Sequence, residues 1–149
     1  MSYSIKFHTR WSDFDANKHL RHTAYNDYAA EARLRLLTEN GFGIDIMEQH
    51  NIGPILFSEN TVFRKEVRLG EDISIELFLE AASKKGERFK LKSLIFNEKG
   101  ELVAVISVYL AWIDLKKRKL TTPPNTILKV LDNINKTDDF EELILKEKK

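Results

Sequence analysis

The stretch TAYNDYAAEARLRLLTEN, residues 23–40, decides the fold, because it is the longest segment with a helical period. Its apolar residues recur at steps of three and four, whereas most of its charged residues lie off that stripe. The stripe consists of Tyr25, Tyr28, Ala29, Ala32, Leu36 and Leu37. His22 or Thr23 lies near the N-cap, and Gly41 suits the left-handed position that ends a helix. We therefore expect one long helix with a single packing face.

After this helix the apolar pattern changes to a period of two, which is typical of strands with one buried face. Between residues 73 and 80, isoleucine and leucine alternate with serine, glutamate and phenylalanine. The segment 102–113 is apolar on both faces and is expected to be the central strand. The expected strands are residues 3–10, 55–67, 73–80, 89–96 and 102–113. The predicted order is a strand, the long helix, and then four strands in a meander.

The C-terminal part predicts helix again. Pro123 and Pro124 end the sheet, and residues 125–134 and 137–149 each have helical character, so a helical extension is expected over about 122–149. A long helix followed by antiparallel strands packs on one face of the sheet that those strands form. We therefore predict a single α+β domain over residues 1–149, with an antiparallel sheet wrapped around the long helix.

Composition narrows the function classes. The chain has 149 residues, of which 42% are hydrophobic and 32% charged, as in an ordinary globular domain. It has no cysteine, so disulfides and thiolate chemistry are excluded. The net charge of +1 predicts no nucleic-acid partner. The sequence contains no run of about 20 apolar residues, so we predict no membrane insertion. The N-terminus lacks the apolar core of a signal peptide. The expected compartment is the cytoplasm.

One dense polar cluster, residues 10–25, lies in the loop that leads into the long helix. The first amides of a helix lack intrahelical acceptors and carry partial positive charge, so they stabilise an anion such as a developing oxyanion. Asp15, a few residues upstream, could serve as a nucleophile or as the base for a water molecule. The alternative remains open on these residues alone, because Asp and Asn before a helix are common caps and turn formers.

The cluster also resembles a known family. It reads Arg10-Trp-Ser-Asp-Phe-Asp15, then His19-Leu, then Tyr25-Asn-Asp-Tyr28, then Glu31-Ala-Arg33. This order and spacing resemble the signature of the 4-hydroxybenzoyl-CoA thioesterase-like branch of the hotdog superfamily. The segments 62–73 and 99–114 resemble the second strand and last hairpin of that family. The resemblance implies a hotdog fold and hydrolysis of an acyl-CoA or acyl carrier protein thioester to a free acid and a thiol.

By this resemblance, Asp15 matches the catalytic aspartate, and a backbone amide near His22 or Thr23 matches the oxyanion donor. The resemblance also implies a homodimer or tetramer, with the sheets joined across the dimer and each active site between subunits. The acyl group would enter beside the helix, and the nucleotide of CoA would reach basic surface residues. The candidates for that contact are Arg64, Lys65 and Arg68. A charged edge strand explains these three residues equally well.

The remaining candidates each keep two interpretations. His19 helps to position Asp15, or it is a structural histidine that anchors the turn. Tyr25 and Tyr28 line an acyl pocket, or they pack in the core. Asp13 is expected to organise the loop or an assembly contact and not to perform chemistry. Two histidines and one aspartate in this loop could bind a metal, but their spacing matches no metal motif, so we predict no metal and no cofactor.

Two other functions compete with hydrolysis. Dehydratases on the same fold pair a histidine with a carboxylate across the active site, and His19 is suited to that role. A non-catalytic acyl-thioester-binding module would keep the pocket but have no use for Asp15. Fold alone does not decide between these chemistries.

Overall fold

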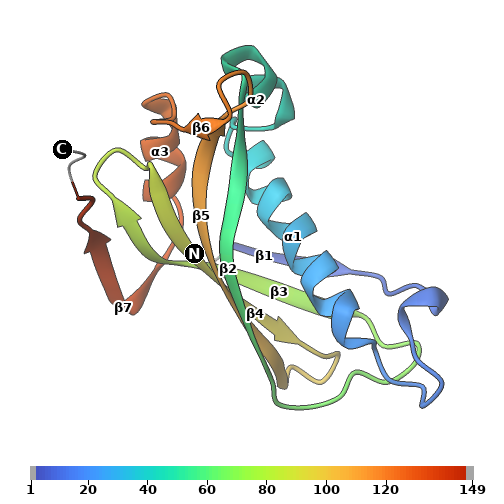
Figure 1. Cartoon of the computed structure of the whole chain (residues 1–149). Helices are drawn as coiled ribbons and strands as arrows, with labels where there is room; N and C mark the ends of the chain where they lie inside the picture. Colours follow the sequence, from blue (N-terminus) through green and yellow to red (C-terminus); the bar gives the residue numbers. More distant parts are fainter. Residues whose placement is uncertain (1–2, 147–149) are drawn as a thin grey trace.

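The computed structural model describes residues 3–146 and is drawn in Figure 1. The helices are η1 (Trp11–Asp13, a 3-10 turn), α1 (His22–Glu39), α2 (Ile44–His50) and α3 (Thr126–Asp132). The strands are β1 (Tyr3–Phe7), β2 (Ile52–Phe63), β3 (Ile73–Ser83), β4 (Arg88–Phe96), β5 (Leu102–Asp114), β6 (Lys119–Leu120) and β7 (Lys136–Leu143). Among the described helices, none combines the length and apolar character that crossing a bilayer requires.

The strands form one curled sheet in the order β1-β3-β4-β5-β2, with β6 paired to β5 and β7 paired to β3. All neighbours are antiparallel except β3 and β7, which are parallel. The long helix α1 lies against one face of this sheet (Figure 1). The predicted α+β architecture, an antiparallel sheet around one long helix, is confirmed.

Close packing of α1 on the sheet follows from small side chains on its buried face. Ala29 and Ala32 are fully buried, whereas Ala30 is exposed. Opposite them, the odd-numbered residues of β3 are buried and the even-numbered ones are half-buried, as the period of two predicts. Ile75 and Leu77 have no exposed surface. The alanines therefore bring the helix backbone close to a continuous layer of branched side chains.

The predicted four-strand meander is wrong in its first strand. Only β3, β4 and β5 form a meander, and β2 pairs with the other edge of β5 instead of with β3. The central strand of the order β1-β3-β4-β5-β2 is β4, not the predicted segment 102–113, which forms β5. Residues 64–72 connect β2 to β3. Three strand spacings separate β2 from β3, about 14 Å, and nine residues span up to about 30 Å. The connection is therefore long enough to cross the end of the sheet.

The C-terminal extension is only partly helical. The helix predicted at 125–134 is present as α3, but the helix predicted at 137–149 is wrong over residues 137–146, where β7 forms up to Leu143 and residues 144–146 are not helical. Residues 147–149 of that prediction lie outside the described residues. The reason is the edge of β3: β1 pairs with residues 73–77, and β7 pairs with residues 79–83. Backbone groups at that edge gain partners which a helix would not supply.

Gly86, in the turn between β3 and β4, joins the sheet to α3. Its φ of +73° is left-handed, and its carbonyl oxygen accepts a hydrogen bond of 3.1 Å from Trp112 Nε1. A Cβ atom at this position would lie 2.8 Å from Ile127 Cγ2 of α3. Both Trp112 and Ile127 are fully buried. Only glycine fits both the conformation and the space of this turn.

Candidate functional site

The polar cluster forms a small hairpin between β1 and α1, at the end of the molecule where residues 64–72 also pass (Figure 1). Phe14 and Leu20 form a bridge, and the Asp15 amide donates to the His19 carbonyl at 2.9 Å. The Lys18 amide donates to the Asp15 carbonyl at 3.0 Å, and Lys18 itself has a left-handed φ of 65°. A turn followed by a left-handed residue is a common way to close a short hairpin. This turn brings Asp15 opposite His19.

The two carboxylate oxygens of Asp15 have different surroundings. Oδ1 accepts hydrogen bonds from the amides of Asn17 (2.9 Å) and His19 (3.1 Å). Oδ2 has no hydrogen-bond donor among residues 3–146, and the side chain is exposed. The backbone therefore fixes the orientation of the carboxylate and leaves one oxygen open for chemistry.

The N-terminus of α1 lies next to this hairpin. Arg21 is the N-cap with extended backbone angles, and it makes no side-chain capping bond. The Ala24 amide donates to the Arg21 carbonyl at 3.0 Å, whereas the amides of His22 and Thr23 have no acceptor within the described part of the chain. Both of these residues are exposed. Two free amides at the positive end of an 18-residue helix make a suitable place for an anion.

His19 ties the hairpin to the connection between β2 and β3. Its Nε2 atom lies 2.9 Å from Glu66 Oε2. Beside it, the Leu20 amide donates to the Val67 carbonyl at 2.9 Å, and the Leu69 amide donates to the Lys18 carbonyl at 3.0 Å. The backbone of His19 thus holds the carboxylate of Asp15, while its side chain faces Glu66.

Both candidate tyrosines of α1 reach the neighbourhood of the loop. Tyr25 is buried, with its ring edge-on to Phe63 at 5.2 Å, and burial raises the pKa of its hydroxyl. Tyr28 is half-buried and donates to Asp13 Oδ2 at 2.5 Å. Burial, followed by this bond, raises the pKa of the Tyr28 hydroxyl.

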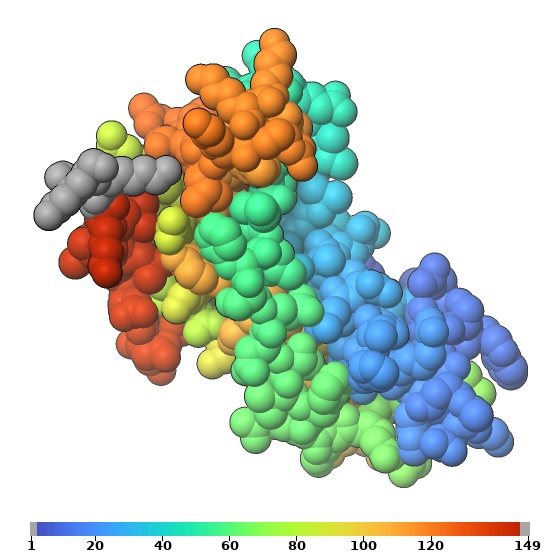
Figure 2. Space-filling view, in the orientation of Figure 1, coloured from blue at the N-terminus to red at the C-terminus, as the bar shows by residue number. Residues whose placement is uncertain are grey.

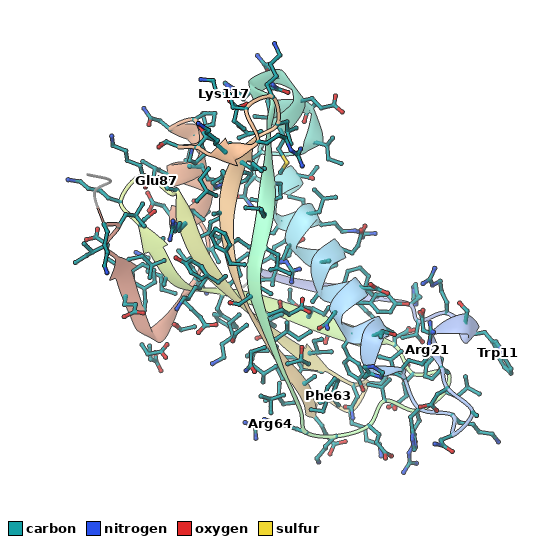
Figure 3. All side chains as sticks on the ribbon, viewed as in Figure 1. Trp11, Arg21, Phe63, Arg64, Glu87 and Lys117 are labelled. Carbon is teal, nitrogen blue, oxygen red and sulfur yellow. The ribbon has the colours of Figure 1, made fainter. Side chains whose placement is uncertain are left out.

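The three basic candidates separate in space. A surface hollow of about 450 Å³ beside the hairpin is lined in part by Lys65, Arg68 and Lys99. The ammonium group of Lys65 is paired with Glu101, whose carboxylate has a lowered pKa because of that hydrogen bond. Arg64 is outside this lining, at the lower end of β2, where Figure 3 labels it. Lys99, contributed by the β4–β5 hairpin turn, was not predicted from the sequence.

Asp13 is the buried carboxylate of the loop, and it contacts Arg10 and Tyr28. Its place two residues before Asp15 was visible in the sequence, but its burial and its bond to Tyr28 had no signal there. Among the described residues, no group of three or more His, Cys, Asp or Glu side chains is arranged to hold a metal ion.

An antiparallel sheet curled around one long helix, with a carboxylate loop at the start of that helix, defines a hotdog-fold protein, and a family match places it in the thioesterase class. Residues 9–131 match the family described as the thioesterase-like superfamily, and the chain belongs to that family. The predicted class, a thioester hydrolase of the hotdog fold, is thereby confirmed. No protein of curated function matches the chain.

Several solved structures share this fold. A hypothetical protein of Staphylococcus aureus in complex with CoA has a TM-score of 0.82 and 18% identity, over 92% of this chain and 88% of that one. A DHNA-CoA thioesterase of Staphylococcus aureus has a TM-score of 0.75 and 26% identity, over 81% and 80%. A 1,4-dihydroxy-2-naphthoyl-CoA thioesterase of Synechocystis has a TM-score of 0.79 and 15% identity, over 89% and 97%.

Proposed function

We propose that this protein hydrolyses an acyl-CoA or acyl carrier protein thioester, with Asp15 as the catalytic carboxylate and the amides of His22 and Thr23 as the oxyanion donors. One observation carries the proposal. Asp15 has one oxygen held by two backbone amides and one oxygen free, a few residues before two unpaired helix amides. The CoA complex and the CoA thioesterases with the same fold support CoA as the thiol.

In the proposed reaction, the carbonyl oxygen of the thioester accepts hydrogen bonds from the amides of His22 and Thr23. These donors stabilise the negative charge that develops on that oxygen. Asp15 Oδ2 then attacks the carbonyl carbon, the thiolate leaves, and water hydrolyses the mixed anhydride. Alternatively, Oδ2 takes a proton from the water that attacks the carbonyl carbon. Either route consumes one water and yields one free acid and one thiol, with no cofactor.

The CoA end of the substrate fits the hollow beside the hairpin. Arg68 and Lys99 line it, and Arg68 pairs in backbone register with His19 of the hairpin. The side chain of Arg68 makes no ion pair within the described residues. Cations without an ion pair suit the phosphates of a nucleotide, and here they act against three glutamates that also line the hollow: Glu66, Glu71 and Glu101.

The acyl end requires a second copy of the chain. Asp15, His22 and Thr23 are all exposed, so a single chain excludes little water from the reacting atoms. The outer edge of β2 has no partner strand within the described residues and runs uncovered across the front of Figure 2. Four large apolar residues of β2 are between 44% and 49% exposed: Leu56, Phe57, Val62 and Phe63. A long apolar edge of this kind favours pairing with another strand.

Arg33 of α1 supports the same interface. Its Nη1 atom is buried and has no hydrogen-bond partner within the described residues, and burial lowers its pKa. The carboxylate of Glu59 on β2 favours the charged guanidinium but makes no ion pair with it within the described residues. An acceptor from a second copy, brought in along β2, would satisfy this nitrogen. We therefore propose a homodimer joined at β2, in the cytoplasm.

The test is release of thiol from a panel of short, long and aromatic acyl-CoAs and their carrier-protein equivalents. Asp15→Asn keeps the shape of the side chain and removes its charge, so kcat is expected to fall by about 100-fold or more. The matched control is Asp27→Asn, an exposed aspartate on α1 whose side chain makes no hydrogen bond to residues 3–146, and it is expected to keep wild-type rates.

The outcomes separate the candidate functions. Equal turnover by wild type and Asp15→Asn would refute the assigned chemistry. A wild-type protein that binds acyl-CoA without releasing thiol would be a binding module. Loss of water from a hydroxyacyl thioester would instead indicate a dehydratase, for which the pair of His19 and Glu66 supplies the expected side chains.

A further inference from the structure

Asp13 is buried to a degree that is unusual for a carboxylate. Its side chain is 2% exposed, and it is the one buried charged residue within residues 3–146. An isolated charge in such a place is strongly unfavourable, so charged residues are buried only with partners. The contacts of Asp13 therefore have to compensate for its lost hydration.

Two residues supply those contacts. Asp13 Oδ2 accepts from the Arg10 amide at 3.1 Å and from the Tyr28 hydroxyl at 2.5 Å, and Oδ1 accepts from Arg10 Nη2 at 3.0 Å. Burial on its own raises the pKa of Asp13, but the hydrogen bonds from Arg10 and Tyr28 outweigh it and hold the pKa below its usual range. Arg10 Nε also donates to Oδ2, at 3.3 Å, so the side chain is a stable anion with four donors.

These contacts join three separate segments. Arg10 follows β1, and Tyr28 lies in the second turn of α1. The carbonyl oxygen of Asp13 accepts the Arg21 amide at 2.8 Å, directly before the helix begins. Figure 3 labels Arg21 and Trp11 at this corner, where the 3-10 turn meets the start of α1. Asp13 is therefore fixed to the helix through its side chain and through its backbone.

We infer that Asp13 is a positioning residue, which holds Asp15 at a set distance from the amides of His22 and Thr23. The inference rests on the proposed function, because the catalytic roles of Asp15 and of these two amides are themselves proposed. Asp15, the proposed catalytic carboxylate, is two residues after Asp13. His22, the first proposed oxyanion donor, is one residue after Arg21, whose amide donates to the Asp13 carbonyl. Asp13 therefore connects the carboxylate to the oxyanion donors. Because rates depend steeply on the alignment of reacting groups, a small shift of this loop lowers kcat. Substrate affinity is expected to change little, since the Asp13 side chain is only 2% exposed and so makes no direct contact with a substrate.

The decisive variant is Tyr28→Phe, which removes one donor and leaves Asp13 and the aromatic ring in place. It is expected to lower kcat by about 10-fold, with KM within about 2-fold of wild type, because alignment and not binding is lost. Asp13→Asn is expected to lower kcat further. A rise in KM at constant kcat would overturn the inference and assign Tyr28 to substrate binding instead.

The structural control is Ser83→Ala. Ser83 is also buried and makes two hydrogen bonds, to Glu87 and from the Arg88 amide, but it lies in the β3–β4 turn. It is expected to lower the melting temperature and to keep kcat. If Ser83→Ala lowered kcat as much as Tyr28→Phe at equal folded fraction, general destabilisation would explain the effect and the inference would be wrong.

A second readout needs no activity. Amide hydrogen exchange over residues 14–23 is expected to accelerate by about 10-fold or more in Tyr28→Phe and not in Ser83→Ala. If wild type hydrolyses no thioester, the proposed function fails and this exchange pattern alone judges the positioning role. Unchanged exchange in Tyr28→Phe would overturn that role, whatever the activity of Asp15→Asn.

Discussion

Replacing Gly86 by alanine tests how tightly α3 is joined to the sheet. The substitution places a non-glycine residue at a φ of +73°, which costs about 1–2 kcal/mol. It also places a Cβ atom 2.8 Å from Ile127 Cγ2, and overpacking of this kind costs about 1–3 kcal/mol. A stiffer unfolded chain offsets about 0.4–1 kcal/mol. The expected loss in free energy of unfolding is therefore about 3 kcal/mol.

Gly100→Ala is the matched control, because Gly100 has a similar φ of +78° but no atom of the described residues within 4 Å of the point that a Cβ atom would occupy. It isolates the conformational cost and should lose about 1 kcal/mol. Urea unfolding at one protein concentration measures both variants. With an m-value of about 2 kcal/mol/M, Gly86→Ala lowers the midpoint by about 1.5 M and Gly100→Ala by about 0.5 M. Equal shifts would refute the tight contact between Gly86 and Ile127.

Three further predictions concern acid, assembly and the C-terminus. Because the pKa of Asp13 in the folded protein lies below its ordinary value, the ionised side chain stabilises the fold fully above about pH 4, and this contribution is lost as the pH falls through the folded pKa. The urea midpoint of wild type should therefore fall in that acid range, and that of Asp13→Asn should fall much less. Val62→Lys on β2 should weaken self-association by about 10-fold or more in sedimentation velocity, while Leu120→Lys, equally exposed on β6, should not. Ending the chain before Lys136 should cost about 2 kcal/mol or more of unfolding free energy and cause aggregation visible by light scattering, whereas ending it after Leu143 should not.

The elements of the fold were predictable where one local pattern acted alone. The stripe of α1 and the alternation of β3 place these elements within one to three residues of their observed bounds. Residues 137–146 were misassigned because Phe140, Leu143 and Ile144 follow a helical spacing and acidic residues favour strands poorly. Pairing with the free edge of β3 overrides that preference. Such an edge is a property of the assembled sheet, which no local pattern contains.

The candidate site was predictable only where its residues are neighbours in the sequence. The order of Asp15, His19 and His22 along the loop follows from the sequence, and their catalytic roles stay predictions. The bond between Tyr28 and Asp13 depends on the rotation of α1 relative to the loop, 15 residues away. Lys99 reaches the hollow beside the hairpin only because β4 and β5 turn back at that end of the sheet. Contacts between distant segments require the tertiary arrangement.

The shared edge of β3 also sets an order of events during synthesis. Leu77 pairs with Tyr3, and Leu79 pairs with Lys136. The first and last described strands, β1 and β7, therefore pair with the same edge of β3. Residues 79–83 stay without an outer neighbour until residues 136–143 have left the ribosome. At about 5–20 residues per second, the more than 50 residues between them leave this edge open for several seconds. The nascent chain therefore depends on its late segment to escape off-pathway pairing, and slow translation there would raise its demand for chaperones.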